Sequence, residues 1–301
     1  MINELLRGTG VALVTPFNSQ GGVDFPALEK VINFVIDGGV DYLVSLGTTG
    51  ETPVLSHAEK LEVLQCTFDA TAGRVPIVIG SGGNDTASVI REIESFPVEK
   101  AAAILSASPY YNKPSQEGIF QHYKAVAAAT TRPIILYNVP GRTGSNIAAA
   151  TTVRLSKEVD NIHGIKEASG NLAQCMQILR DVSPDFLVVS GDDNLAMAQI
   201  ACGMRGVISV AANCFPKDFS RMVNYALDGD FAGARGINDR LLAGYELLFA
   251  ENNPAGVKAF LAELGIIQNH LRLPLVPLSS GLHDQVRGYL QQLHGAPGIH
   301  A

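Results

Sequence analysis

The sequence predicts an α/β protein built as a (β/α)8 TIM barrel with a C-terminal helical extension. Short apolar runs recur eight times along the 301 residues, segments with helix-start chemistry lie between them, and only helical patterns follow the eighth run. Continuous apolar runs, as opposed to alternating ones, are typical of parallel strands that are buried on both faces. Strand, loop and helix repeated eight times is the pattern of a closed barrel with its helices outside.

The predicted strands are short runs of mainly aliphatic residues. In chain order they cover residues 11–14, 42–46, 77–79, 103–105, 134–137, 163–166, 186–189 and 206–210. A doubly wound sheet is the structural alternative. It requires a glycine-rich GxGxxG motif after the first strand, and Thr15-Pro16-Phe17-Asn18 does not supply one.

The predicted helices begin at residues whose side chains can accept a hydrogen bond from the first helical turn. Asp24 precedes apolar positions spaced three and four apart, Ser56 with Glu59 forms a capping box, and Ser115 precedes a third periodic segment. These start signals fall between the apolar runs, as the barrel pattern requires.

We expect the barrel to form the catalytic domain over residues 1–215, with its last helix running on to about residue 228. Residues 229–301 form the C-terminal helical region, and its clearest helical segments are 231–250 and 254–264. The region carries no strand pattern, which indicates an addition to the barrel and not a second catalytic domain.

Composition limits the classes of function. The net charge is −7 and the pI about 5.5, so a nucleic acid or an anionic membrane has no basic surface to bind. No apolar run reaches the roughly 18 residues of a membrane span, and no secretion signal opens the chain, so we expect a cytoplasmic protein. The four cysteines lie far apart without metal-ligand spacing, and we interpret them as reduced core residues with no metal site.

Polar residues follow the predicted strands at the end where barrel enzymes carry their active sites. They lie at 47–51, 108–112, 137–142, 166, 190–193 and 208–209. Lys166 stands at the end of an apolar strand, where a simple ion pair with Glu167 or Asp192 is the alternative to a catalytic role. We interpret Asp192-Asp193 as a helix N-cap before Leu195, because one adjacent pair is weak evidence for a metal.

A lysine in a barrel mouth suggests imine chemistry. In water the side chain is almost wholly protonated at pH 7, but desolvation disfavours an ammonium ion, and a neutral amine attacks carbonyl carbons. With a 2-oxo acid the imine becomes an enamine without any metal or organic cofactor. The Thr48-Thr49 turn suits a small carboxylate, Tyr137 can move protons, and Arg142 can bind a second carboxylate.

Five motifs in order resemble the dihydrodipicolinate synthase family, which belongs to the pyruvate-dependent class I aldolases and lyases. They are "GTTGETPVLS" at 47–56, "SPYYNKPSQEGIFQHY" at 108–123, "YNVPGRTG" at 137–144, "GIKEASGN" at 164–171 and "SGDD" at 190–193. The resemblance runs from about Gly8 to Leu293. It implies condensation of pyruvate with L-aspartate-4-semialdehyde to 4-hydroxy-tetrahydrodipicolinate, the first committed step of diaminopimelate and lysine biosynthesis.

The resemblance also implies roles for individual residues and for a partner subunit. Lys166 matches the lysine that forms a Schiff base with pyruvate, and Tyr137 matches the proton-relay tyrosine. The other matches are Thr49 as the hydroxyl between two tyrosines, Thr48 at the pyruvate carboxylate, Tyr111 inserted from a neighbouring subunit, Arg142 at the aldehyde substrate, and Gly191 with the Ile208 carbonyl as lining positions. A homo-oligomer follows, either a dimer or a homotetramer.

Family members that are inhibited by lysine have an effector site, and this sequence departs from it. The matching positions are Thr52, His57, Asn84, Ser88 and Tyr110. Ser88 stands where inhibited members usually carry a glutamate, and Lys60 stands where a neutral residue or a histidine is usual. A missing carboxylate and an added cation both disfavour a cationic ligand, so we expect weak or no inhibition by L-lysine.

Two other functions stay open on the sequence. A sister aldolase, such as N-acetylneuraminate lyase or a 2-oxo-3-deoxy-sugar-acid aldolase, would share Lys166, Tyr137 and the two threonines. Arg142 discriminates against it, because a polyhydroxylated substrate calls for neutral groups there. The other is a catalytically inactive barrel that only binds a ligand or a partner protein.

Overall fold

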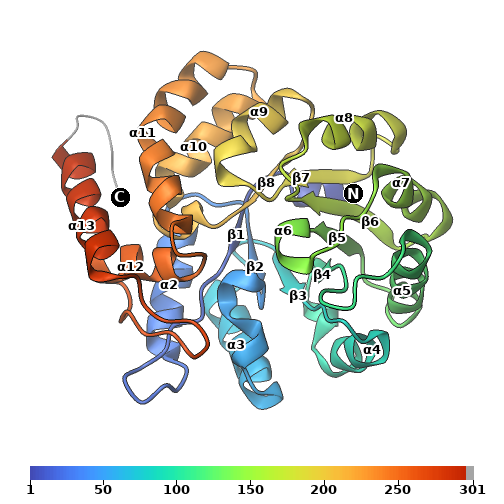
Figure 1. Ribbon diagram of the computed structural model, residues 1–301, viewed down its shortest axis with the longest axis horizontal. Coiled ribbons are helices and arrows are strands. Elements are labelled where there is room, and N and C mark those ends of the chain that lie inside the picture. The colour runs from blue at the N-terminus through green and yellow to red at the C-terminus, as the bar shows by residue number, and fades with distance from the viewer. Residues whose placement is uncertain (296–301) are drawn as a thin grey trace.

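The computed structural model describes residues 1–295, and its eight parallel strands close into a barrel in the order β1 to β8, with β1 paired to β8. This confirms the predicted (β/α)8 fold (Figure 1). The strands are β1 Gly8–Ala12, β2 Tyr42–Ser45, β3 Ile77–Gly80, β4 Ala103–Ala107, β5 Ile134–Asn138, β6 Ile162–Glu167, β7 Leu187–Ser190 and β8 Gly206–Ser209.

The first strand differs most from its prediction, since it starts at Gly8 and ends at Ala12. Glycine has a low strand propensity, so Gly8 and Gly10 hide the start of the strand in the sequence. At the other end, the Val14 N–H leaves the sheet and donates to the side chain of Asn213 at 3.3 Å. The predicted strand over 11–14 was therefore placed too late.

Helices surround the barrel and begin where the sequence predicted. The Asp24 side chain accepts from Ala27 N, Ser56 and Glu59 form the capping box, and Ser115 accepts from Gly118 N. The helices up to the end of the barrel are α1 Ile2–Leu5, α2 Phe25–Asp37, α3 His57–Thr71, α4 Thr86–Ser95, α5 Gln116–Ala128, α6 Pro140–Thr143, α7 Ala149–Glu158, α8 Leu172–Asp181, α9 Ala196–Ala201 and α10 Pro216–Leu227.

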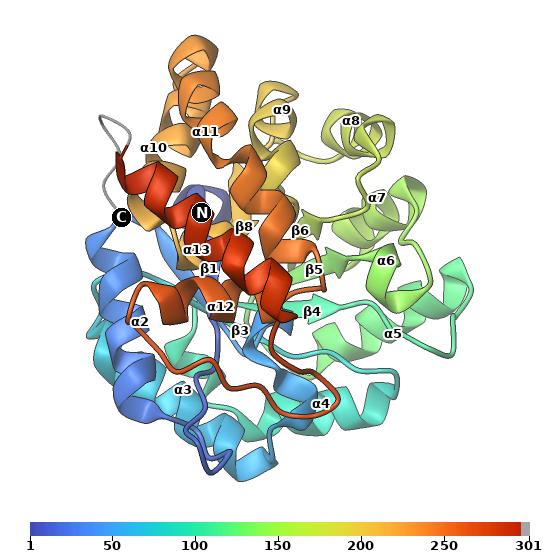
Figure 2. The same cartoon turned by 60° about the vertical axis from the view of Figure 1, so that its left-hand side comes forward.

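The C-terminal extension consists of α11 Phe231–Phe249, α12 Ala255–Glu263 and α13 Ser280–Gly295. Helix α13 packs across α11 and α12 (Figure 2). Buried side chains of the extension, among them Tyr245, Phe260 and Leu290, share one apolar cluster with barrel residues such as Val11 and Leu43. The division of the chain near residue 228 stays a prediction, and its last residues, 296–301, lie outside the described part.

The barrel interior has its own apolar cluster, to which Tyr42, Val44, Leu105, Ile135 and Tyr137 belong. Tyr42 is fully buried against Gly10, where a Cβ atom would lie only 2.2 Å from the tyrosine ring. A residue other than glycine at position 10 would therefore displace the ring, and the filled interior leaves the open end of the barrel as the place for a ligand.

Other sequence interpretations concern membranes, metals and cysteines. Within residues 1–295 no helix is both long and apolar enough to cross a membrane, and no three His, Cys, Asp or Glu side chains gather as a metal site. All four cysteines are free thiols, with Cys175 and Cys214 buried and Cys66 and Cys202 half-buried.

Candidate active site

The residues that end the strands meet around a small cavity at one end of the barrel. It brings together six of the predicted residues, Thr48, Thr49, Tyr137, Arg142, Lys166 and Gly191. Ile208 was predicted to contribute its carbonyl, which stays a prediction; its side chain lies in the interior cluster, and Val210 is the lining residue that follows β8.

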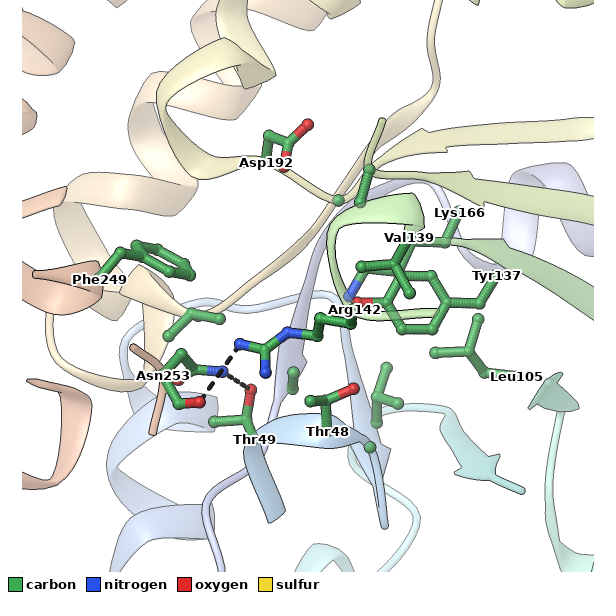
Figure 3. A pocket seen from close by; sticks show the side chains of 16 residues that line it. Thr48, Thr49, Leu105, Tyr137, Val139, Arg142, Lys166, Asp192, Phe249 and Asn253 are labelled. Carbon is green, nitrogen blue, oxygen red and sulfur yellow. Dashed lines mark hydrogen bonds between the residues drawn. The ribbon is translucent and has the colours of Figure 1, made fainter. Parts of the chain in front are cut away.

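Lys166 lies on β6 directly beside Tyr137 on β5, because the two residues are partners in the strand register. Both side chains point into the barrel (Figure 3), and the Lys166 ammonium nitrogen lies 4.4 Å from the centre of the tyrosine ring. Only 5% of Lys166 is exposed. Gly191 leaves room for it, since a Cβ atom there would lie 2.9 Å from Lys166 Cε.

The ion-pair alternative for Lys166 survives only as a longer-range interaction with Asp192, whose pKa is raised by burial and lowered by the Lys166 charge. Glu167 follows Lys166 on the strand and points the opposite way, where its carboxylate accepts hydrogen bonds from Asn138 and Gln174. Asp192 lines the cavity, but none of the ion pairs between described residues includes Lys166. Lys166 is therefore buried in the cavity without a close ion pair.

The helix N-cap predicted at Asp192-Asp193 is wrong, because neither side chain makes a capping hydrogen bond. A short helical turn does begin at Asp193, but no side chain caps it. The Asp193 carboxylate reaches across to the loop after β8, where it accepts from Val210 N at 3.2 Å and from Ala211 N at 2.8 Å. Burial raises the pKa of Asp193 to about 6. Asp193 therefore stabilises the loop that follows β8 and does not cap the helical turn in which it lies.

The Thr48-Thr49 turn follows β2 as a single 3-10 turn, Thr48–Gly50. The Thr15 hydroxyl donates to Gly50 O at 2.8 Å and ties this turn to the segment after β1. Thr49 is 1% exposed, and its hydroxyl oxygen accepts a hydrogen bond from Asn253 Nδ2 at 2.9 Å. Both threonines face the cavity from the side opposite Asp192 (Figure 3).

Arg142 projects from α6 into the middle of the cavity, between the Lys166–Tyr137 pair and the C-terminal extension (Figure 3). Its guanidinium donates to the backbone oxygen of Asn253 at 3.3 Å. The position suits a guanidinium that binds the carboxylate of a substrate whose other end reaches the lysine.

Two lining residues, Phe249 and Asn253, were missed by the sequence reasoning. They end α11 and lie in the loop before α12, in the region that we interpreted as a helical addition. The polar sequence Asn252-Asn253-Pro254 between two helices could have indicated them, because loops often carry the polar side chains of a binding site.

Tyr110 and Tyr111 lie on the loop after β4 and point to different places. Tyr111 is 87% exposed and lies outside the cavity of its own chain. Tyr110 is 41% exposed and lines a second, wider cavity, which also reaches Tyr137 and Arg142. The structure thus leaves Tyr111 at the surface of its own chain.

The predicted effector residues divide between two places. Thr52, Lys60 and Tyr110 line the second cavity. His57 stacks on Phe96, with ring centres 6.2 Å apart, and Asn84 and Ser88 are on the neighbouring loop and the start of α4. The Lys60 ammonium pairs with Glu92 at 2.6 Å. The positive charge of Lys60 in this cavity is therefore already balanced by Glu92.

The match to known proteins covers almost the whole chain. The profile of the "Dihydrodipicolinate synthetase family" matches residues 5–293. The chain is 49% identical to the 4-hydroxy-tetrahydrodipicolinate synthase of Parabacteroides distasonis, over 96% of this chain and 97% of that protein. The chain belongs to the dihydrodipicolinate synthetase family.

Solved structures of the family agree in fold. The dihydrodipicolinate synthase of Aquifex aeolicus superposes with a TM-score of 0.93 at 38% identity, over 96% of this chain and 98% of that one. The chloride-inhibited enzyme of Acinetobacter baumannii, solved in complex with pyruvate, superposes with a TM-score of 0.92 at 40% identity, over 95% and 98% of the two chains. Membership of this enzyme family confirms the resemblance and favours neither a sister aldolase nor an inactive barrel.

Proposed function

We propose that the protein condenses pyruvate with L-aspartate-4-semialdehyde to form 4-hydroxy-tetrahydrodipicolinate, as the committing lyase of diaminopimelate and lysine biosynthesis in the cytoplasm. The observation that carries the proposal is the Lys166–Tyr137 pair, buried in the barrel mouth and facing Arg142 across one cavity. A relative from Acinetobacter baumannii has been solved with pyruvate, which supports the choice of the first substrate.

The chemistry uses the side chains alone, and we assign no metal or organic cofactor to it. Lys166 Nζ attacks C2 of pyruvate, the carbonyl oxygen leaves as water, and a protonated imine remains. The imine draws electrons from the methyl group, which loses a proton and becomes an enamine carbon. That carbon attacks the aldehyde carbon of the second substrate, and the aldehyde oxygen takes up a proton. The amine of the second substrate then attacks C2 and displaces Lys166, which closes the ring.

Two protein groups steer these steps. The Tyr137 hydroxyl is placed to carry protons to and from the carbonyl oxygen and the methyl group, because its residue is the register partner of Lys166. Arg142, which lines the same cavity as Lys166, binds the carboxylate of the semialdehyde. The Thr48-Thr49 turn receives the pyruvate carboxylate.

The active form is a homo-oligomer, either a dimer or a homotetramer. An exposure of 87% is unusual for a large aromatic side chain, and the residue before Tyr111, Tyr110, lines the second cavity together with Tyr137. We assign Tyr111 to the site of a neighbouring subunit, as the family resemblance implies.

The imine is tested by treating the protein with pyruvate and borohydride and measuring the intact mass. We expect a gain of one reduced pyruvate adduct per chain. The Lys166→Ala variant should gain nothing, whereas Lys124→Ala, a change at an exposed lysine on α5, should behave like the wild type. An adduct that persists in Lys166→Ala, or no adduct in the wild type, would overturn the mechanism.

A further inference from the structure

Two residue pairs stand back to back at the ends of β5 and β6. Tyr137 and Lys166 are register partners and point into the barrel, and the next partners, Asn138 and Glu167, point outward. The outward pair is joined by hydrogen bonds from Asn138 Nδ2 to both carboxylate oxygens of Glu167, each at 3.0 Å. Both residues are 0% exposed. They are also the last residues of their strands, where a sheet opens most easily.

The pairing of β5 with β6 contains an irregularity below this contact. Ile134 pairs with Ile162, but Ile135 pairs with Gly164, so one extra residue, the exposed His163, stands between them. Such a bulge changes which face the following side chains occupy, and a slip of one residue would turn Lys166 out of the barrel. The pairs above the bulge, from Ile135 with Gly164 to Asn138 with Glu167, therefore set the face that Lys166 occupies.

The Glu167 carboxylate is surrounded by N–H donors and not by cations. Besides Asn138 it accepts from Gln174 Nε2 on α8 at 3.0 Å and from Ser169 N at 2.8 Å, and it makes none of the ion pairs found between described residues. The side-chain oxygen Oδ1 of Asn138 in turn accepts a hydrogen bond from Ile147 N at 2.9 Å. Such a fully bonded buried anion has one low-energy arrangement, because any shift leaves charge and donors unpaired.

We infer that Asn138 and Glu167 are positioning residues for the imine chemistry, and that their contact holds Tyr137 in register beside Lys166. The inference rests on the proposed function, because it assigns the register a role in moving the pyruvate methyl proton. Figure 3 shows how closely the Lys166 and Tyr137 side chains lie, so a small sliding of β5 against β6 separates the proton carrier from the imine. A displacement of about 1 Å in such an arrangement can reduce a rate by on the order of 10²-fold.

The test measures exchange of the pyruvate methyl hydrogens with D2O, which requires the imine and the enamine but no aldehyde. The Glu167→Gln variant loses the negative charge of the carboxylate, and an amide N–H donor then faces the N–H donor of Asn138. We expect the exchange rate per folded chain to fall on the order of 10²-fold. The pyruvate concentration that gives half of the maximal rate should change little, because Thr48 and Thr49 still receive the carboxylate.

Two further variants keep the result decisive. Gln174→Met keeps the Asn138–Glu167 contact but removes the α8 amide that donates to Glu167 and accepts from Asn146, so it should fold and lose on the order of tenfold in exchange rate. Glu158→Gln makes the same chemical change at an exposed residue of α7 and should match the wild type. If Glu167→Gln does not fold, Gln174→Met decides.

A lower melting temperature with an unchanged exchange rate per folded chain would overturn the positioning role, because it would show a purely structural contact. A wild type that neither traps pyruvate nor exchanges its methyl hydrogens would overturn the proposed function itself. The two failures are thus told apart by the wild-type measurement alone.

Discussion

The side-chain amide of Asn253 donates a hydrogen bond to the Thr49 hydroxyl at 2.9 Å, across 204 positions of the chain. Because that oxygen accepts from Asn253, its own proton is free to point into the cavity, toward the groups beside Lys166. The backbone oxygen of Asn253 also accepts from Arg142 at 3.3 Å. One loop of the C-terminal extension therefore orients two groups of the barrel mouth.

We expect Asn253→Ala to lower kcat by about tenfold, because the Thr49 hydroxyl loses the donor that orients it. Steady-state kinetics with both substrates measures the change. The same substitution in a Thr49→Val background should cost much less, since the group that it orients is already gone. Equal losses in the two backgrounds would show that Asn253 acts elsewhere.

Much of this architecture could be predicted from the sequence, because barrel strands buried on both faces are apolar along their whole length. Lys166 interrupted such a run, and the register of the closed barrel does place it in the mouth beside Tyr137. The fold and the side chains at the strand ends follow from local pattern together with the rule that parallel strands end at one edge.

The contacts that cross the chain could not be predicted. Asn253 lies between two helices, and nothing nearby in the sequence says that its amide meets Thr49. Asp193 has the local signature of a helix cap, yet it bonds the loop after β8, because tertiary packing offered it two buried N–H groups. Local sequence patterns indicate which residue types matter. Their hydrogen-bond partners follow only from the tertiary structure.

The ion pair between Lys258 and Glu51 anchors α12 to the loop after β2. Both side chains are 0% exposed, the nitrogen and oxygen lie 2.5 Å apart, and the lysine also donates to His270 O. Burial lowers the pKa of Lys258 to about 8. We expect Lys258→Met to lower the free energy of unfolding by about 3–5 kcal/mol, because it leaves a buried carboxylate unpaired.

Urea denaturation at pH 7 measures that loss. Adding Glu51→Gln to Lys258→Met removes the unpaired charge and should recover part of the lost stability. Arg180→Met, at a side chain that is 73% exposed, should leave the denaturation midpoint where it is. A double variant as unstable as the single one would contradict the electrostatic explanation.

The second tie between the extension and the barrel depends on pH. The Arg272 guanidinium donates to Glu59 and lowers the pKa of this carboxyl from 4.5 to about 2. A lowered pKa means that the pair stabilises the fold fully above the unfolded value, and that this contribution disappears as the pH falls from 4.5 toward 2.

The stability difference between the wild type and Glu59→Gln should therefore be constant above pH about 5 and shrink toward zero near pH 2. Urea denaturation of both proteins over that range is the measurement. A difference as large at pH about 3 as at neutral pH would show that Glu59 contributes through its capping-box contact with Ser56 and not through its charge.

Inhibition by L-lysine should be weak. Ser88 holds Asp85 and Arg91 through its hydroxyl and offers no carboxylate, and Glu92 is already paired with Lys60. Calorimetry with millimolar L-lysine is expected to give no saturable heat. The Ser88→Glu variant restores the acidic group and should bind more tightly than the wild type; clear saturable heat from the wild type would refute the prediction.

Sharing of the active site between subunits predicts that two inactive variants repair one another. Tyr111→Phe alters a residue that is 87% exposed in its own chain, and Lys166→Ala removes the amine that forms the imine. Each alone should be nearly inactive. When the two are unfolded, mixed in equal amounts and refolded, half of the dimers are hybrids, and each hybrid holds one site with an intact lysine and an intact tyrosine.

About a quarter of the wild-type activity should then return, because one site in two is whole in half of the dimers. Refolding each variant separately and mixing afterwards is the control, and it should regain nothing until the subunits exchange. If the co-refolded mixture stays inactive while the dimers form, Tyr111 belongs to no neighbouring site, and the exposed aromatic needs another partner.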